Sequence, residues 1–366
     1  MKKEISSVED GALQQNIEAV EPESTATLAL DYDLSKDYIL RVRNLKQYFP
    51  VSKNFIGKVQ AYLKAVDGVS FNLERGKTIG IVGESGCGKT TLGRTILRLY
   101  EITEGSAIYK DESGKEYELA KLKRKELQPL RTELQLVFQD PYSSLPPRMT
   151  VGAIISEAVR VHKIVPKEQV HDYVLGVMKR CGLQPHYYDR YPHEFSGGQR
   201  QRICIARALA VKPKLVICDE PVSALDVSIQ AQVINLLKKL QREEGISYMF
   251  ISHDLSVVKY ISDTIAVMYL GNIVEMGTAA DICTAPKHPY TQALFSAVPV
   301  PNPHRKADPE MLEGELPSPA NPPKGCKFHT RCKHCMGICE EVAPQMREIA
   351  KGHYVECHLF NNEEKK

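Results

Sequence analysis

A glycine-rich segment in the first third of the chain has the residue types needed to bind phosphate groups. Residues 83–90, GESGCGKT, match the pattern G-x-x-x-x-G-K-S/T. Glycines let backbone N–H groups approach phosphate oxygens closely, because no Cβ atom intervenes. Lys89 is expected to reach the β- and γ-phosphates, and the Thr90 hydroxyl to bind Mg²⁺. The predicted nucleotide-binding residues of this loop are Gly83, Glu84, Ser85, Gly86, Cys87, Gly88, Lys89, Thr90 and Thr91.

Two adjacent carboxylates follow an apolar run later in the chain. Residues 215–220, LVICDE, are typical of a buried strand that ends in Asp219 and Glu220. Ligands of open α/β sheets bind at the carboxyl ends of the strands, so both acids would lie near the phosphate loop. Asp219 is predicted to hold Mg²⁺, directly or through water, and Glu220 to orient and polarise the attacking water. Two exposed acids at a strand end are the alternative.

A third segment, FSGGQRQR at 195–202, has the features of a helix start. Ser196 is a good N-cap residue, and Gly197 and Gly198 leave backbone N–H groups uncovered at the positive end of the helix dipole. Such an end can bind an anion. The chain already has one phosphate site. A second anion site at this helix start therefore suggests that the segment serves a nucleotide held by another subunit. An ordinary glycine-containing helix start is the alternative.

The elements around these motifs predict an α/β fold. Residues 78–82 are typical of a buried strand, and Leu92, Ile96 and Leu99 repeat at helical spacing after the loop. Helical spacing continues through residues 150–212, and strands and helices alternate after that. We therefore expect a P-loop (RecA-like) nucleotide-binding core with a largely parallel sheet and a helical insertion. Strands at 38–49 and 65–76 would form an antiparallel edge.

The chain is expected to have three parts. Residues 1–36 contain three basic and eight acidic side chains without periodicity, which predicts a mostly disordered acidic tail. Residues 37–300 would form the ATP-binding domain, with a helical subdomain at about 141–212. Residues 301–366 would be a proline-rich connector and a small cysteine-rich C-terminal extension, because seven prolines lie between Pro301 and Pro323.

Composition excludes several functional classes. With 48 basic and 45 acidic residues the net charge is only +3, so no broad electrostatic footprint for nucleic acid exists. No apolar run approaches the roughly 18 residues of a transmembrane helix, and no signal-peptide core precedes the first strand. We therefore expect a protein without a nucleic-acid partner that stays inside the cell. Five scattered cysteines are expected to be reduced: Cys87, Cys181, Cys204, Cys218 and Cys283.

Taken in order, the motifs resemble those of the ATP-binding subunits of ABC transporters. GESGCGKT resembles Walker A, Gln139 the Q-loop glutamine, FSGGQ the signature, LVICDE Walker B, residues 223–226 (SALD) the D-loop, and His253 the switch histidine. The resemblance implies that two such domains enclose two ATP molecules, each between the Walker motifs of one domain and the signature of the other. Soluble ABC proteins share these motifs but usually carry tandem cassettes or a coiled coil.

The resemblance also implies a role for single residues. The signature residues Ser196, Gly197, Gly198 and Gln199 would contact the ATP held by the partner. His253 would contact the γ-phosphate in the same chain, and Gln139 would sense the nucleotide through Mg²⁺ and water. Phe49 matches the position whose aromatic ring stacks on adenine in the family, with Tyr48 and Tyr62 as alternatives.

Two further stretches narrow the family. VFQDPYSSLPPRMTVGAIISEAV, with Pro146 where asparagine is common, and HPYTQALFSAVP are similar to the oligopeptide/dipeptide importer ATPases. This resemblance implies ATP-driven peptide import at the cytoplasmic face of the membrane. The implied partners are a second ATPase subunit in a heterodimer, two transmembrane permease subunits and an extracytoplasmic peptide-binding protein. Nickel or another small solute remains an alternative cargo.

Five cysteines gather near the C-terminal end of the chain: Cys326, Cys332, Cys335, Cys339 and Cys357. Their spacing does not match the paired C-x-x-C of zinc ribbons, but four thiolates can hold zinc or a [4Fe–4S] cluster. The family resemblance implies a [4Fe–4S] cluster bound by Cys326, Cys332, Cys339 and Cys357. Zinc or no metal are the alternatives, and His329, His334, His353 and His358 leave mixed ligation open. A metal that holds this small segment together is favoured over one that performs redox catalysis. A redox-sensing protein with an ancillary ATPase is a third possibility for the whole chain.

Overall fold

The structure is a computed structural model that describes residues 35–53, 59–297 and 314–361. Most of the predicted acidic tail, residues 1–34, and the first part of the predicted proline-rich connector, residues 301–313, lie outside the described residues, as do residues 298–300 of the predicted ATP-binding domain.

Within the described residues, the larger of two sheets has eight strands in the order β11-β12-β10-β9-β3-β8-β7-β6. The strand β3 pairs in parallel with β8 and β9, and β7 pairs in parallel with β6 and β8. The carboxyl ends of β3 and β7 therefore meet at one edge of the sheet, as the predicted parallel sheet requires. The bounds are β3 Thr78–Val82, β6 Leu134–Val137, β7 Leu215–Asp219, β8 Ser247–Ile251, β9 Thr264–Tyr269, β10 Asn272–Thr278, β11 Met346–Ala350 and β12 His353–Glu356.

The predicted antiparallel edge is a separate sheet. The strands β1 and β2 do pair antiparallel, but they form a four-stranded sheet in the order β2-β1-β4-β5 instead of joining the main sheet. On its other side β1 pairs antiparallel with β4, and β4 pairs antiparallel with β5. The alternating pattern identified both strands and their pairing with each other, but not the separate sheet or the further neighbour β4. The bounds are β1 Tyr38–Lys53, β2 Val59–Glu74, β4 Glu104–Lys110 and β5 Glu116–Glu118.

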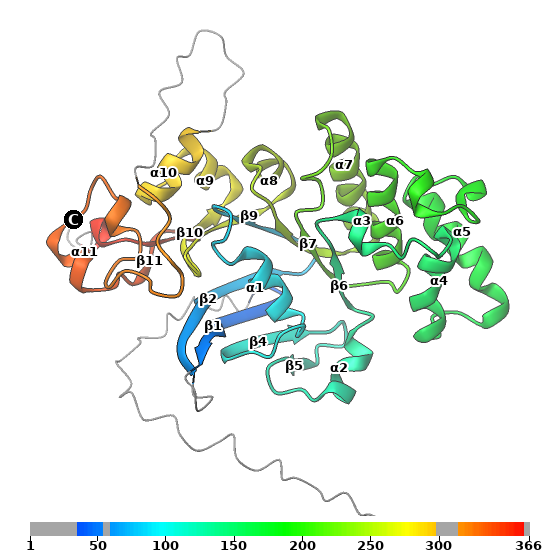
Figure 1. Cartoon of the computed structure of the whole chain (residues 1–366), viewed down its shortest axis with the longest axis horizontal. Coiled ribbons are helices and arrows are strands. Elements are labelled where there is room, and N and C mark those ends of the chain that lie inside the picture. Colours follow the sequence, from blue (N-terminus) through cyan, green and yellow to red (C-terminus); the bar gives the residue numbers. More distant parts are fainter. Residues whose placement is uncertain (1–34, 54–58, 298–313, 362–366) are drawn as a thin grey trace, which may run out of the picture.

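The predicted helical insertion is present at the right of Figure 1, where α4, α5 and α6 lie together. Its first short helix, α3, begins because Asp140 accepts hydrogen bonds from the backbone N–H groups of Tyr142 and Ser143. The α-helix bounds are α1 Lys89–Ile96, α2 Arg124–Leu130, α3 Pro141–Ser144, α4 Val151–Val161, α5 Val170–Arg180, α6 Gly197–Leu209, α7 Val227–Glu244, α8 Leu255–Ile261, α9 Ala279–Thr284, α10 Pro289–Ser296 and α11 Gly337–Glu341. Among the described residues, none of these helices combines the length and apolar character of a membrane span.

The C-terminal segment is not a separate small extension. Its strand β12 pairs antiparallel with β10, and β11 pairs with β12, so both strands extend the main sheet. Cys326, Phe328 and Cys339 belong to the same buried hydrophobic cluster as the helical insertion and much of the main sheet. The segment, orange and red at the left of Figure 1, is therefore packed onto the ATP-binding domain.

A buried polar network joins this segment to α10. The Glu275 carboxylate of β10 accepts hydrogen bonds from the backbone N–H groups of Lys287 and His288, at 2.7 and 2.9 Å, and lies 2.7 Å from Nε2 of His353 in β12. His288 Nδ1 in turn accepts the backbone N–H of Tyr290 at 3.0 Å, which caps α10. Because Glu275 and His288 are almost completely buried, these bonds fix the start of α10 against the sheet.

We expect acidification to destabilise the protein through His288. Burial lowers the pKa of His288 to about 4, from an ordinary 6.5, although the Glu275 carboxylate opposes the shift. Between these values the unfolded chain binds a proton that the folded chain does not, so stability is present above pH 6.5 and lost toward pH 4. The free energy of unfolding should fall by up to about 3 kcal/mol across this window.

Urea denaturation at several pH values measures this effect in the wild type and in His288→Asn, which keeps a capping acceptor. The variant should show a flatter pH dependence, whereas the same change at the exposed His171 should leave it unaltered. An identical pH dependence in His288→Asn and the wild type would rule out His288 as the cause.

Candidate functional site

The phosphate loop adopts a conformation that only glycine allows at two positions. Gly83 and Gly88 have φ values of 149° and 107°. A Cβ atom on Gly83 would lie 2.1 Å from the carbonyl oxygen of Met268, and one on Gly88 would lie 2.0 Å from that of Ala65. The loop thus passes tightly between β9 and β2, where a side chain on either glycine would collide with neighbouring backbone.

Lys89, the first residue of α1, points back into this loop. Its side chain is buried, and Nζ donates to the carbonyl oxygens of Gly83 and Glu84 at 2.8 and 2.9 Å. A buried ammonium inside a ring of loop backbone is placed to bind phosphate oxygens, next to the positive end of the α1 dipole. The structure therefore brings together the glycines and the lysine that the motif predicted.

Asp219 and Thr90 form the second part of the site. Thr90 Oγ1 donates to Asp219 Oδ1 at 2.7 Å, although the two residues are 129 positions apart. Asp219 is 1% exposed, and its Oδ2 is buried without a hydrogen-bond partner, 3.7 Å from a guanidinium nitrogen of Arg94. Burial raises the pKa of Asp219, against the effects of Thr90 and Arg94. A hydroxyl and a carboxylate oxygen with spare acceptor capacity fit a hard cation such as Mg²⁺.

Three side chains from three different segments converge at Glu220. Gln139 Nε2 donates to Glu220 Oε2 at 2.9 Å, and His253 Nδ1 lies 3.2 Å from the same oxygen. Glu220 itself has φ of 46°, a left-handed conformation that is costly for a side-chain-bearing residue and is found most often at functional sites. The carboxylate is mostly buried while His253 is exposed, so the group faces an open side of the protein.

This arrangement can perform phosphoryl transfer to water. The buried Lys89 and the loop N–H groups would hold the phosphates, Asp219 and Thr90 would hold the cation, and Glu220 would lie beside the attacking water. Such chemistry depends on position and electrostatics, because the protein forms no covalent bond to the phosphate.

The signature segment is not part of this cluster in the single chain. Ser196 caps α6, with its hydroxyl accepting the Gln199 N–H at 3.4 Å and the Gln199 side chain accepting the Ser196 N–H at 3.1 Å. The helix begins at Gly197, and a Cβ atom on Gly198 would lie 2.3 Å from the Ile229 side chain. In Figure 1, α6 lies with α3 and α7, away from α1.

The three aromatic candidates for the adenine platform lie in the β1–β2 hairpin. The Phe49 ring packs edge-on against Tyr100, with 5.2 Å between the ring centroids. The Tyr48 hydroxyl donates to the Asp67 carboxylate, so the polar end of the Tyr48 side chain already has a partner. Tyr62 is 48% exposed. The geometry does not choose among them, so Phe49 stays a prediction.

The C-terminal thiols lie near one another. The Cys326 N–H donates to the Cys339 carbonyl at 2.8 Å. Burial, with smaller contributions from Cys339 and Cys357, raises the pKa of Cys326 to about 12. The donor set suits a soft metal, but within the described part of the chain no three or more His, Cys, Asp or Glu side chains are placed to hold one. The predicted cluster is therefore not confirmed.

Sequence reasoning missed Tyr290, which supports the phosphate loop. The Tyr290 hydroxyl of α10 accepts the backbone N–H of Glu84 at 2.9 Å. The two residues are 206 positions apart, and no spacing pattern links them. Only the fold of the C-terminal part places α10 beside the loop.

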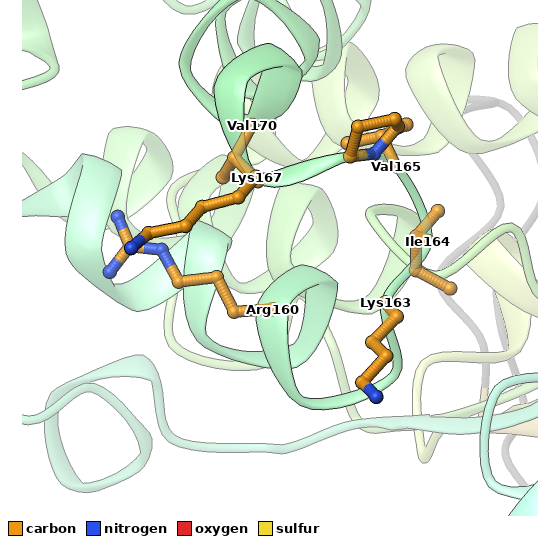
Figure 2. Close-up of a pocket in the computed structure, with 7 residues that line it drawn as sticks. Arg160, Lys163, Ile164, Val165, Lys167 and Val170 are labelled. Atoms are coloured by element: carbon orange, nitrogen blue, oxygen red, sulfur yellow. The ribbon is translucent and has the colours of Figure 1, made fainter.

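A pocket in the helical insertion is separate from this site. It has a volume of about 590 Å³ and lies between the end of α4 and the start of α5, lined by Arg160, Lys163, Ile164, Val165, Pro166, Lys167 and Val170. Figure 2 shows the Arg160 and Lys167 side chains extending to the same side of the view and Lys163 away from them. None of these residues belongs to the motifs that bind the nucleotide.

Comparison with known proteins agrees with this geometry. Residues 66–223 match the family model described as "ABC transporter", and residues 274–339 match "Oligopeptide/dipeptide transporter, C-terminal region". The chain is 51% identical to the oligopeptide transport ATP-binding protein AppF of Bacillus subtilis, over 89% of this chain and 99% of that protein. It is 49% identical to the dipeptide transport ATP-binding protein DppF of Escherichia coli, over 89% of this chain and 96% of that protein.

Solved structures show the same fold. The ATP-binding cassette MJ0796, a dimer in a post-hydrolysis state with ADP and Pi, matches with a TM-score of 0.57 and 26% identity, covering 66% of this chain and 98% of that one. CbiO1 from Clostridium perfringens, part of the ABC transporter complex cbiONQ, matches with a TM-score of 0.56 and 29% identity, covering 68% and 91%. The chain therefore belongs to the ATPase subunits of the oligopeptide/dipeptide ABC transporter family.

Proposed function

We propose that this chain hydrolyses ATP to power the import of dipeptides and oligopeptides through a membrane ABC transporter. The convergence of Gln139, Glu220 and His253 beside the phosphate loop carries the proposal. In a family whose named members are peptide transport ATP-binding proteins, this arrangement supports an active ATPase.

Each residue of the site has a proposed role in hydrolysis. Lys89 and the loop bind the phosphates, and Thr90, Asp219 and Gln139 hold Mg²⁺, which when bound neutralises phosphate charge. Glu220 accepts hydrogen bonds from the attacking water and polarises it, while His253 contacts the γ-phosphate. Phe49 is the proposed adenine platform.

We propose that the signature residues Ser196, Gly197, Gly198 and Gln199 complete the ATP site of a second subunit. The start of α6 lies away from α1 in Figure 1, which supports a role toward a nucleotide held by another subunit. ATP would close the dimer, closure would move the membrane helices, and hydrolysis at Glu220 would reopen it. The partner is proposed to be a similar but distinct ATPase.

The chain is proposed to act at the cytoplasmic face of the membrane. Its further partners would be two transmembrane permease subunits and an extracytoplasmic peptide-binding protein. The family match over residues 274–339 supports the peptide class over nickel or another small solute, and over a soluble ABC protein. Residues 37–300 would supply the ATPase, with residues 301–366 joined to it through the main sheet.

Purification of the native complex from membranes tests these partners. The chain should co-purify with a second ATPase subunit and two membrane subunits, identified by mass spectrometry. Recovery of the chain alone from the soluble fraction, under conditions that preserve known transporters, would contradict the proposal.

We also propose, from the resemblance of this end to the cysteine motif of the importer ATPases, that Cys326, Cys332, Cys339 and Cys357 bind a [4Fe–4S] cluster that holds the C-terminal segment together, with zinc as the alternative. Protein purified without oxygen should contain about four iron atoms per chain and show broad visible absorption. Cys335→Ser should keep the iron, since that exposed thiol falls outside the set, and Cys339→Ser should lose it. Metal-free wild-type protein would refute the cluster.

A further inference from the structure

An arginine of the C-terminal segment reaches the phosphate loop. Arg331 lies in the short helical turn His329–Arg331, between two of the clustered cysteines. Its Nη1 donates to Glu84 Oε2 at 2.8 Å and its Nη2 donates to Glu84 Oε1 at 3.1 Å. This is a two-pronged ion pair across 247 residues of sequence, and such pairs fix geometry as well as charge.

The pair is protected from solvent. The Arg331 side chain is 7% exposed and the Glu84 side chain 25% exposed. The guanidinium lies over the ring of Tyr269, 5.9 Å from its centroid, and that ring packs against Phe328 and Tyr290. Partial burial makes the ion pair stronger than a surface pair, because water screens it less.

Glu84 connects this pair to the lysine that binds phosphate. Its backbone N–H donates to the Tyr290 hydroxyl, and its carbonyl oxygen accepts Lys89 Nζ at 2.9 Å. Arg331 therefore orients the residue that in turn positions Lys89. It also neutralises a carboxylate on the phosphate loop itself, where a free negative charge would repel a triphosphate.

We propose that Arg331 is a positioning residue for ATP, through which the C-terminal segment sets the affinity of the phosphate loop for the nucleotide. The proposal rests on the assignment of residues 83–90 as the ATP phosphate site. It goes beyond that assignment, because it links the cysteine-bearing segment to ATP binding through a contact with the phosphate loop.

The test measures binding of MgATP and steady-state hydrolysis in the full chain. Arg331→Gln should raise the Kd and KM for MgATP about five- to twentyfold, within the usual range for coupled sites. Its kcat should change little, because the ion pair of Arg331 is with Glu84 of the phosphate loop and not with Glu220. Arg331→Lys, which keeps the charge but not the fork, should recover part of the affinity.

A double-mutant cycle separates this role from simple loosening of the segment. In the Glu84→Gln background the further change Arg331→Gln should have little effect on Kd, since the charge it neutralises is gone. Lys327→Gln is the matched control: Lys327 lies in the same segment and is similarly buried, but bonds Asp67, Asn272 and the Leu270 carbonyl. It should leave the Kd near that of the wild type.

Two outcomes would overturn the proposal. One is an unchanged Kd in Arg331→Gln, and the other is an equal loss of affinity in Arg331→Gln with and without Glu84. The assignment of the ATP site is tested separately by Lys89→Ala in the same assay. If Lys89→Ala loses binding while Arg331→Gln does not, the positioning role alone fails.

Discussion

Replacing Glu220 with glutamine is expected to abolish steady-state ATP hydrolysis while leaving ATP binding intact. The amide keeps the size and one hydrogen-bond acceptor of the side chain but cannot accept a proton from the attacking water. We expect hydrolysis to fall about 10²- to 10⁴-fold, the usual contribution of general-base catalysis. Phosphate release under saturating MgATP measures the rate, and equilibrium binding of a fluorescent ATP analogue measures the affinity.

Glu244 offers the matched control for this change. Its side chain is 19% exposed, close to the 16% of Glu220, but it pairs with Arg180 at the far end of α7. Glu244→Gln should hydrolyse ATP at the wild-type rate. Undiminished hydrolysis in Glu220→Gln would show that the base lies elsewhere.

Replacing Lys89 with alanine is expected to remove most of the affinity for MgATP. The buried ammonium is held inside the phosphate loop by two carbonyl oxygens, and its hydrogen bonds to phosphate would be charge-assisted. The loss should be about 30- to 150-fold in Kd, corresponding to 2–3 kcal/mol for hydrogen bonds of charged groups. Titration with a fluorescent ATP analogue measures it.

Lys77 provides the control for loss of positive charge. It lies just before β3, is 54% exposed and pairs with Asp263 on the surface. Lys77→Ala should keep the wild-type Kd at physiological ionic strength, since surface pairs contribute little. Equal Kd values for Lys89→Ala and the wild type would contradict the phosphate-loop assignment.

The local parts of the site could be predicted from the sequence. An apolar run followed by a glycine-rich turn and a helical repeat encodes strand, loop and helix within some twenty residues, from Thr78 of β3 to Ile96, where α1 ends before the predicted Leu99. The apolar run before Asp219 predicted a buried strand, and every residue of β7 is buried in the structure. Because β3 and β7 run parallel in one sheet, their carboxyl ends had to lie at the same edge of that sheet.

Long-range partners could not be predicted. Alternation identified β1 and β2 as strands, but the pairing of β1 with β4 in a second sheet depends on packing that no local pattern records. The strand β6 ends at Val137, and Asp140 after it caps α3.

The C-terminal segment shows the same limit more clearly. Its cysteines suggested a small extension in need of a metal, because spacing reveals possible ligands but not the buried contacts around them. In the structure, β12 joins the main sheet and the Arg331 side chain reaches Glu84. Contacts across more than 200 residues depend on the completed fold.

The most direct test of the account is uptake of a labelled dipeptide or oligopeptide into vesicles that contain the purified transporter and its binding protein. ATP is supplied on the side that carries this subunit, and the wild type is compared with Glu220→Gln. The account predicts uptake that requires ATP and is lost in the variant. Equal uptake by both proteins, or uptake without ATP, would contradict the claim that hydrolysis at Glu220 drives peptide import.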